Sequence, residues 1–126
     1  MDLASVRIFV TDLPAAAKFY AEVVGLEQIW SSPEAVVFGK EPMVVIEAAD
    51  AEAHMEGLVG RFTGVAFATD DATALYHRLT GARVPTEGAP ERQSWGGILL
   101  HAKDPSGNTI TFLQVPKGSA AKGSDP

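Results

Sequence analysis

An approximate internal repeat constrains the fold of this chain more than any other feature of its sequence. A short apolar run that ends in Thr-Asp occurs at residues 6–12 and again at residues 64–70. Each run is followed by a stretch with helical periodicity, and each of these stretches ends at a glycine. Short β-branched runs favour strands, and apolar residues spaced three and four apart favour amphipathic helices. The repeat therefore predicts two modules that each begin with a strand and a helix.

The ends of the two predicted helices carry residue types that are typical of helix boundaries. The helices are expected near residues 13–24 and 72–80. An aspartate before a helix can accept hydrogen bonds from the first backbone N–H groups, and a glycine tolerates the left-handed conformation past the last turn. The residues expected in these places are Asp12 and Asp70 at the N-termini, and Gly25 and Gly81 at the C-termini.

Short apolar runs follow each helix, and their β-branched and aromatic residues favour strands. The runs cover residues 27–30, 35–39 and 43–47 in the first half, and residues 82–86, 97–103 and 109–115 in the second half. The sequence DPSGN at residues 104–108 predicts a tight turn that joins the last two runs into a hairpin. Each half is thus predicted to have the order strand, helix, strand, strand, strand, with residues 48–61 as the link.

Length and composition limit the classes of function that the chain can have. Its 126 residues suit one domain, and 46% of them are apolar, which is ordinary for a folded protein. The lack of cysteine excludes a thiolate nucleophile, a cysteine-based zinc site and disulfides. The net charge of −6 argues against a nucleic-acid partner. No targeting segment is visible and no apolar run reaches the roughly 18–20 residues that span a bilayer, so we expect no membrane partner and a cytoplasmic location.

Several short motifs follow one another along the chain at a characteristic spacing. They are Val10-Thr11-Asp12-Leu13, Phe19-Tyr20, Val24-Gly25-Leu26, Trp95-Gly96-Gly97 and Asp104-Pro105-Ser106-Gly107-Asn108. In this order they resemble the vicinal oxygen chelate superfamily, which includes glyoxalases, bleomycin-resistance proteins and dioxygenases. The resemblance covers about residues 4–115 and implies an α+β fold of two βαβββ modules, which pair into an open, cupped β-barrel with the helices outside.

The resemblance also implies how the chain is divided. It predicts one glyoxalase/bleomycin-resistance-like domain at residues 4–116, with module one at about residues 4–48 and module two at about residues 62–116. Residues 117–126 are rich in Gly, Ser, Ala and Lys, and we expect them to be a disordered tail.

Strand alternation predicts which side chains face the cup, because successive residues of a strand point to opposite faces of a sheet. The residues assigned to the cup in this way are Ser5, Arg7, Phe9, Met43, Val45, Glu47, Gly64, Ala66, Ala68, Leu99, His101, Thr109, Thr111 and Leu113. Most of them are small or apolar, and a few are polar. This mixture is the usual lining of a small-molecule site.

The resemblance raises the question of a metal ion, because metal-dependent members of the superfamily hold a divalent ion on the first and last strands of each module. The positions that the resemblance implies are Ser5, Glu47, Gly64 and Thr111. Only Glu47 can ligate strongly, and Gly64 has no side chain. Because a tight metal site needs three or four good donors in fixed geometry, we expect no metal and no other cofactor.

Three side chains are the sharpest candidates for a functional role. Glu47 would serve as a general base or bind a ligand, or it would only form an ion pair with Arg7. His101 would move a proton or donate to a ligand oxygen, or it is a half-exposed strand histidine without a role. Trp95 would form a stacking wall, or it belongs to the core or to a dimer interface. The full predicted set is Glu47 and His101 as catalytic residues, and Arg7, Phe9, Glu47, Trp95, Leu99, His101 and Thr111 as ligand-binding residues.

Three functions are compatible with these features. The leading hypothesis is a metal-free protein that sequesters or recognises a small organic ligand in an apolar cup. The alternative is a lyase, isomerase or epimerase with Glu47 as base and Arg7 or His101 as the donor to a substrate oxygen. A third is a subunit or regulatory module whose cup is vestigial. We also expect a homodimer that forms through Trp30 and residues 35–39, because open sheet edges need cover.

Overall fold

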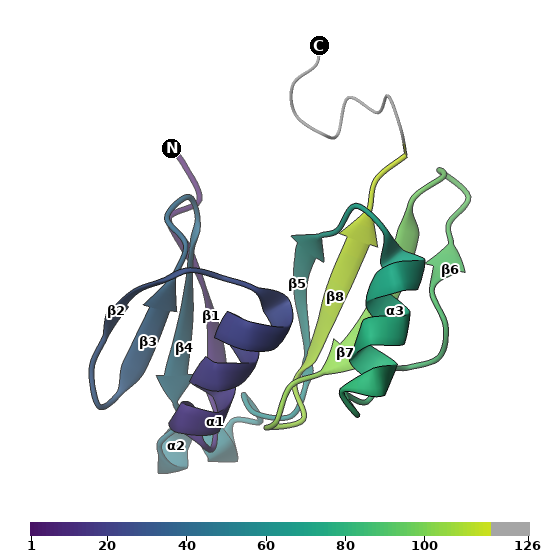
Figure 1. Cartoon of the computed structure of the whole chain (residues 1–126). Helices are drawn as coiled ribbons and strands as arrows, with labels where there is room; N and C mark the ends of the chain where they lie inside the picture. Colours follow the sequence, from purple (N-terminus) through teal and green to yellow (C-terminus); the bar gives the residue numbers. More distant parts are fainter. Residues whose placement is uncertain (117–126) are drawn as a thin grey trace. The chain divides into compact units, whose positions relative to one another are not determined.

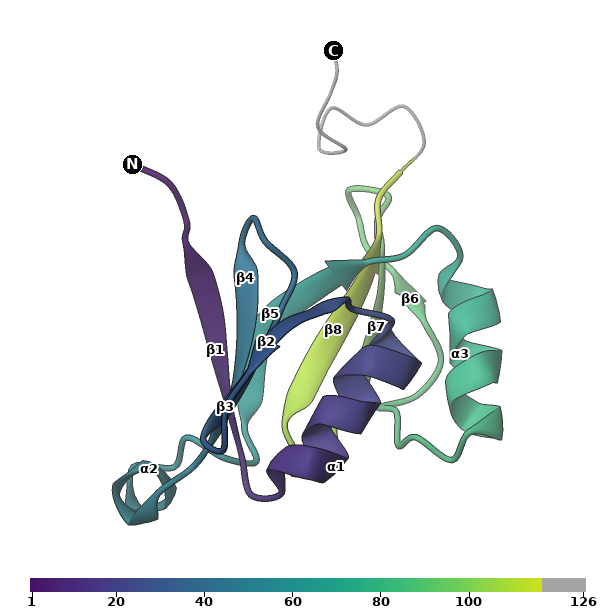
Figure 2. The same cartoon turned by 60° about the vertical axis from the view of Figure 1, so that its left-hand side comes forward.

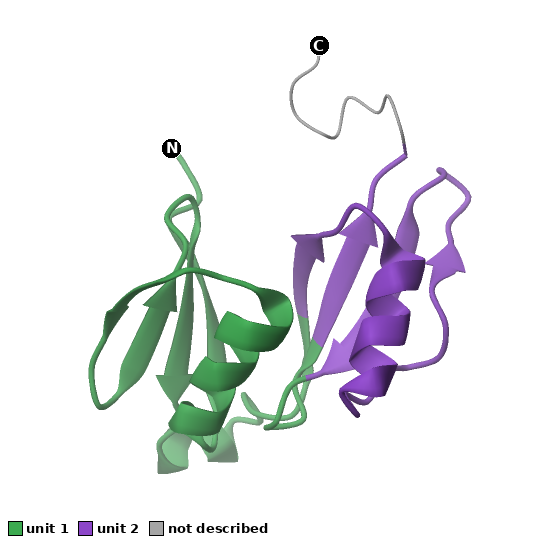
Figure 3. Cartoon of the chain, in the orientation of Figure 1, with its two compact units in different colours: residues 1–63, 104–109 green, residues 64–103, 110–126 purple. Residues whose placement is uncertain are grey.

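The computed structural model of the protein describes residues 1–116, and these residues belong to two compact units. Unit 1 contains residues 1–63 together with residues 104–109 (Figure 3). Unit 2 contains residues 64–103 and continues from residue 110. Each unit holds one copy of the sequence repeat. The tail expected at residues 117–126 lies outside the described residues.

The first repeat forms a four-stranded sheet, called sheet one below, in the order β1-β4-β3-β2 (Figures 1 and 2). β1 runs parallel to β4, and β4, β3 and β2 are antiparallel to one another. A helix follows β1 and continues from α1 into a π-helical segment, η1, and a short helix, α2, lies in the link to the second repeat. The bounds are β1 Ser5–Val10, α1 Leu13–Lys18, η1 Phe19–Val24, β2 Gln28–Ser31, β3 Ala35–Phe38, β4 Met43–Ala48 and α2 Ala51–Met55.

The second repeat forms another four-stranded sheet, sheet two, in the order β5-β8-β7-β6, and α3 follows its first strand (Figure 1). The bounds are β5 Phe62–Ala68, α3 Ala72–Gly81, β6 Glu91–Arg92, β7 Ile98–Lys103 and β8 Thr109–Gln114. Both sheets therefore place the first strand of the repeat beside the last one. The same strand order in both sheets confirms the two βαβββ repeats and the α+β class that the sequence predicts.

Alternation along most strands buries one face of each sheet against a helix, as the sequence predicts, although in β8 Thr109 and Thr111 of the other face are buried as well. In sheet one the buried side chains are Ile8, Val10, Val36, Phe38, Val44 and Ile46, together with Ala16, Phe19 and Tyr20 of the covering helix. In sheet two they are Leu100, Ala102, Ile110 and Phe112, together with Ala72, Leu75 and Leu79 of α3. Burial of a large aliphatic or aromatic side chain contributes roughly 1.5–3 kcal/mol, so these two faces dominate the stability. The opposite face of each sheet, which does not pack against that helix, is called the open face below.

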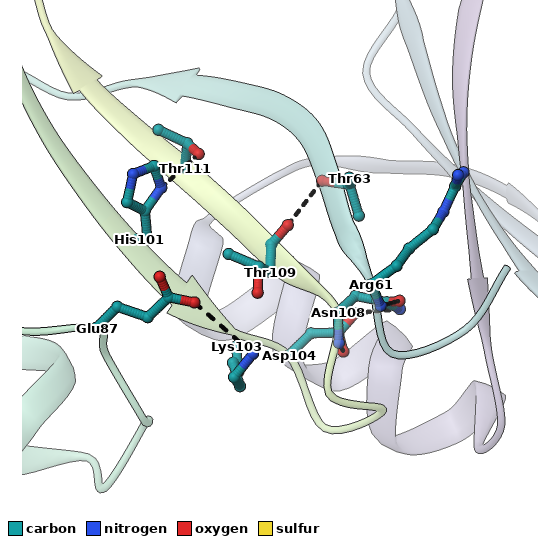
Figure 4. Close-up of polar contacts among 9 residues, drawn as sticks. All are labelled: Arg61, Thr63, Glu87, His101, Lys103, Asp104, Asn108, Thr109 and Thr111. Carbon is teal, nitrogen blue, oxygen red and sulfur yellow. Dashed lines mark hydrogen bonds and ion pairs between the residues drawn. The ribbon is translucent and has the colours of Figure 1, made fainter. Parts of the chain in front are cut away.

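The turn between β7 and β8 belongs to unit 1, where a buried polar network fixes it. Figure 4 shows two members of this network, Asp104 and Asn108. Tyr20 donates its hydroxyl hydrogen to Asp104 Oδ2 at 2.8 Å. Asn108, which is fully buried, donates to Asp104 Oδ2 at 3.0 Å and to the carbonyl oxygen of Phe9 at 2.8 Å, and its Oδ1 accepts from Gly60 N at 2.7 Å. Every polar atom named here has a partner, which is the condition for burying such groups without a large penalty. The DPSGN motif is therefore a tight turn, as predicted. Its side chains also bind the turn to the rest of unit 1.

The structure corrects the predicted cap of the second helix. Asp12 caps α1 as expected, with Ala15 N donating to its Oδ1 at 3.0 Å. In the second repeat the cap is Asp71, which accepts from Ala74 N, so the assignment to Asp70 was wrong. The helix itself begins at Ala72, as predicted, and Ala72 N donates to the side chain of Gln114 at 2.8 Å, so this N–H is not available to Asp70.

The predicted end of the second helix also differs. Gly25 has the expected left-handed φ of 88°, but Gly81 is still helical and α3 is capped by Ala82. The left-handed residue is Arg83, with a φ of 61°. The backbone N–H groups of Arg83 and Val84 donate to carbonyl oxygens of the last helical turn at 3.0 and 2.9 Å, which offsets the strain of that conformation in a residue with a Cβ atom.

The strand predicted at residues 82–86 is absent from the described residues. This segment makes only an isolated bridge between Thr86 and Ala102. The strand that pairs with β7 in its place is β6, which covers only Glu91–Arg92. The early part of the segment is used to close α3, which leaves too few residues to form a ladder there. Within residues 1–116, no helix has the length and apolar character needed to cross a membrane.

Candidate ligand-binding faces

The open face of sheet one brings together Arg7 and Glu47, as predicted. Arg7 lies on β1 beside Val45 of β4, and Glu47 lies two residues further along β4. The guanidinium donates to both carboxylate oxygens, from Nε to Oε2 and from Nη2 to Oε1, the latter at 3.0 Å. The Arg7 side chain is 60% exposed and that of Glu47 is 21% exposed. The pair therefore lies at the protein surface, and Arg7 is its more exposed member.

Phe9 holds the same guanidinium from a second side. The Arg7 Cζ atom lies 5.2 Å from the centre of the Phe9 ring, which is within the range of a cation–π contact. The hydrogen bonds from Arg7 to Glu47, followed by the attraction between their charges, raise the pKa of Arg7. Arg7 is thus a permanently charged group with a defined orientation, because a carboxylate and an aromatic ring both restrain it.

Apolar side chains continue the open face of sheet one next to this pair. The strand register places Arg7 beside Val45, and Val45 beside Val37 of β3. Glu47 is flanked in the same way by Phe9 and Ala35. Val37, Val45 and Phe9 are all partly exposed. Sequence reasoning did not include Val37, although the alternation within residues 35–39 already places it on this face.

The open face of sheet two brings His101 and Thr111 together (Figure 4). His101 on β7 is half-buried, and its Nδ1 atom lies 2.8 Å from Thr111 Oγ1 on β8. Thr111 itself is buried, and its hydroxyl group restrains the imidazole ring through this hydrogen bond. Leu99, two residues before His101 on the same strand, is also partly exposed, as alternation predicts.

A second polar pair stands next to His101 on β7. Lys103 lies two residues further along the strand, and its Nζ atom is 3.8 Å from Glu87 Oε2 (Figure 4). The backbone N–H of Glu87 donates to the carbonyl oxygen of His101 at 3.0 Å, which ties this loop to the strand. Sequence reasoning missed both residues. The period of two along β7 could have identified Lys103, but Glu87 lies just after the strand predicted at residues 82–86, where no pattern indicates its place.

Trp95 lies in the turn that connects β6 and β7, where Gln93 N donates to Gly97 O at 2.7 Å. Its indole ring covers the backbone of Gly97, and the place of a Gly97 side chain is filled by that ring. The ring is nevertheless 56% exposed. Trp95 is therefore positioned by the two glycines that follow it and presents most of its surface outward, away from the buried core of unit 2.

The residues at the implied metal positions do not fit a divalent ion. Gly64 has no side chain, and both oxygens of Glu47 accept hydrogen bonds from Arg7. The Thr111 hydroxyl is bonded to His101, and a hydroxyl is in any case a weak ligand for such an ion. Within residues 1–116 no three His, Asp or Glu side chains are grouped in a way that could hold a metal.

A surface hollow of about 370 Å³ lies apart from the predicted site residues, at the N-terminus of α3. It is lined by Thr69, Asp70, Asp71, Ala74, Leu75 and Arg78. Asp71 is already engaged as the helix cap. The predicted site residues occupy three places in the structure: Arg7, Phe9 and Glu47 on sheet one, Leu99, His101 and Thr111 on sheet two, and Trp95 in the β6–β7 turn.

Comparison with solved structures shows the same fold in proteins of differing function. A lactoylglutathione lyase from Agrobacterium tumefaciens is 26% identical, with 88% of this chain and 91% of that one covered and a TM-score of 0.70. A member of the glyoxalase/bleomycin resistance protein/dioxygenase superfamily from Sphaerobacter thermophilus is 25% identical, with 91% and 98% covered and a TM-score of 0.75. TnmS3, an antibiotic binding protein from a Streptomyces species, is 24% identical, with 90% and 95% covered and a TM-score of 0.71.

The sequence itself matches a family model over most of its length, although no curated protein matches it. The match covers residues 2–112, which includes both repeats and both sheets. The strand order, the two repeats and this match lead to one conclusion. The chain belongs to the Glyoxalase/Bleomycin resistance protein/Dioxygenase superfamily.

Proposed function

We propose that this protein binds a small organic ligand without a metal ion and acts by sequestering or recognising that ligand. The observation that carries the proposal is the state of Glu47, the one strong ligand among the implied metal positions. Both of its oxygens are engaged by Arg7, and Gly64 and Thr111 offer no replacement. An ion pair thus stands where a metal-dependent relative would need a free carboxylate.

The composition of the open sheet faces supports a binding role. Sheet one combines Arg7 and Glu47 with partly exposed Phe9, Val37 and Val45. A few oriented polar groups on an apolar surface are what a small organic ligand needs for orientation and affinity. The likeness to an antibiotic binding protein is compatible with this role, but at 24% identity it supports the fold alone.

A ligand screen on the metal-free protein tests the proposal. The protein is treated with a chelator, and its melting temperature is measured against a broad set of small organic molecules. We expect at least one class to raise the melting temperature in the presence of the chelator, because binding to the folded state alone stabilises it. Arg7→Gln should abolish that shift, whereas Lys18→Gln on the exposed side of α1 should preserve it. A protein that responds to no class, or only after a metal is added, would contradict the proposal.

An enzymatic function is the second candidate, and the geometry of His101 favours it. Its Nδ1 atom is bonded to Thr111, which orients the imidazole for proton transfer or donation to a substrate oxygen. A lactoylglutathione lyase is among the similar structures, at 26% identity. Glu47 would be the base, but a substrate would then have to share or displace Arg7. The test is turnover of lactoylglutathione, with and without added divalent metal, by wild type and by His101→Ala.

A further inference from the structure

We propose that the open face of sheet one selects planar ligands that carry a carboxylate, and that Arg7 recognises the carboxylate with the edge of its guanidinium that Glu47 leaves uncovered. This proposal rests on the proposed binding function and specifies the ligand class for it. It commits to a recognition chemistry that follows from Arg7, Glu47 and Phe9 and from the strand register around them.

The hydrogen bonds of Arg7 define which of its donors remain available. An arginine has five N–H donors in a planar fork. Glu47 takes one from Nε and one from Nη2, which uses one edge of the plane. The second edge, formed by Nη1 and the remaining N–H of Nη2, has no acceptor among residues 1–116. Two parallel N–H groups at this spacing match the two oxygens of a carboxylate.

The available edge is held in place before any ligand arrives. Glu47 fixes the plane of the guanidinium through two hydrogen bonds, and the Phe9 ring lies 5.2 Å from its Cζ atom. A free arginine side chain would lose rotamer freedom on binding, but this one has already lost it on folding. The fork is also accessible, since the Arg7 side chain is 60% exposed.

The surface beside the fork favours a flat apolar body on the ligand. Val45 lies beside Arg7 in the sheet and Val37 lies beside Val45, and both are partly exposed. β-branched side chains on adjacent strands form a low, stiff surface, against which a planar ring buries more area than a bulky ring does. The guanidinium plane can also stack on a ring.

The charges on this face favour a carboxylate over a cation. Glu47 could attract a cationic ligand, but both of its oxygens already accept from Arg7, and its side chain is only 21% exposed. The more exposed member of the pair is the cation. The net charge of −6 repels anions at long range. Salt screens this repulsion beyond about 8 Å, whereas the attraction between the fork and a carboxylate acts at contact distance.

The experiment uses four small probes and the full-length protein. The probes are 2-naphthoate, the neutral 2-naphthamide, the cationic 2-naphthylmethylammonium ion and the non-planar cyclohexanecarboxylate. Affinity is measured by calorimetric titration in a chelator, and the site of binding by the NMR signals of the Arg7 Nε–H group and the valine methyl groups. We expect 2-naphthoate to bind and to shift the signals of Arg7, Val37 and Val45. The other three probes should bind at least tenfold more weakly.

Two variants distinguish the effect of the planar fork from that of the positive charge and from a loss of folding. Arg7→Lys keeps the positive charge but removes the planar fork, and it should weaken both carboxylate probes, 2-naphthoate by at least tenfold. Arg83→Lys makes the same exchange at an exposed arginine of unit 2 and should leave every affinity unchanged. Melting curves on both variants show whether the fold is retained.

The outcomes distinguish this inference from the function on which it rests. If the amide or the cation binds to the Arg7 face as well as 2-naphthoate does, ligand binding stands and the carboxylate selectivity is wrong. Equal affinity of wild type and Arg7→Lys for 2-naphthoate also overturns the role of the fork. If no probe shifts any signal on this face, and the broad ligand screen is silent as well, both the inference and the binding function fail.

Discussion

At the scale of single residues, the two charged networks of unit 1 have different tasks because they differ in exposure. Arg7 and Glu47 pair at the surface of a sheet, where water can replace either partner. Tyr20, Asp104 and Asn108 are buried and joined by hydrogen bonds, so water cannot replace a lost partner there. The first pair can serve a ligand, whereas the second group holds the β7–β8 turn.

Substitution of Glu47 by Gln therefore separates a ligand-related role from a structural one. Because the Arg7 side chain is 60% exposed, its guanidinium can be hydrated once the carboxylate is gone, and we expect the melting temperature to stay close to that of wild type. Asn108→Ala is the contrasting variant, and loss of its buried bonds should lower the free energy of unfolding by about 2–4 kcal/mol. A large loss of stability in Glu47→Gln, measured by thermal denaturation, would make the ion pair structural.

The buried Tyr20 hydroxyl predicts how stability depends on alkaline pH. Burial, then the Asp104 charge and the hydrogen bond to it, raise the pKa of Tyr20 in the folded state above its ordinary value. The folded state therefore retains the proton where the unfolded state releases it, and stability is lost as pH rises above about 10, the ordinary tyrosine value. Urea denaturation between neutral pH and pH 11 should show this loss, with a weaker pH dependence in Tyr20→Phe. Equal slopes in the two proteins would contradict it.

At the scale of elements, the sequence predicted well those strands whose position follows from a single local pattern of residues. β-branched alternation is enough to place β1, β3 and β4, and it also separates Ile8 and Val10 from Arg7 and Phe9. The adjacent Asp70 and Asp71 can both cap a helix, and only the long-range bond from Ala72 to Gln114 selects between them. The short strand β6 and the role of Glu87 depend on where the loop after α3 returns to β7, which no local pattern encodes.

The cap assignment can be tested directly on the two adjacent aspartates. Asp71→Ala removes the acceptor for Ala74 N and should lower the free energy of unfolding by about 1 kcal/mol. Asp70→Ala is the matched control, with the same change in charge one residue earlier and no helix cap to lose, and it should remain within roughly 0.5 kcal/mol of wild type. Equal destabilisation in the two variants, measured by chemical denaturation, would show that the helix begins elsewhere.

At the scale of the whole molecule, the edge of sheet one predicts self-association. β2 is the outer strand of the sheet, and it exposes Ile29 and Trp30, the latter at 58%. An exposed apolar edge is a site for pairing with another chain, so we expect a homodimer through Trp30 on β2, with residues 35–39 of the neighbouring inner strand behind it. Sedimentation at micromolar concentration should show a dimer for wild type and a monomer for Trp30→Glu, with Met55→Glu at another exposed apolar residue as the control. A monomeric wild type at these concentrations would contradict this prediction.

The proposed function requires that the whole molecule works without a metal ion, because an arginine engages Glu47 where a metal would need that carboxylate free. The most direct measurement is the amount of metal bound per chain after equilibrium dialysis against micromolar Ni²⁺, Zn²⁺ and Mn²⁺, determined by elemental analysis. We expect much less than one ion per chain, with the same value for wild type and Glu47→Ala. One tightly bound ion per wild-type chain, lost in Glu47→Ala, would contradict it.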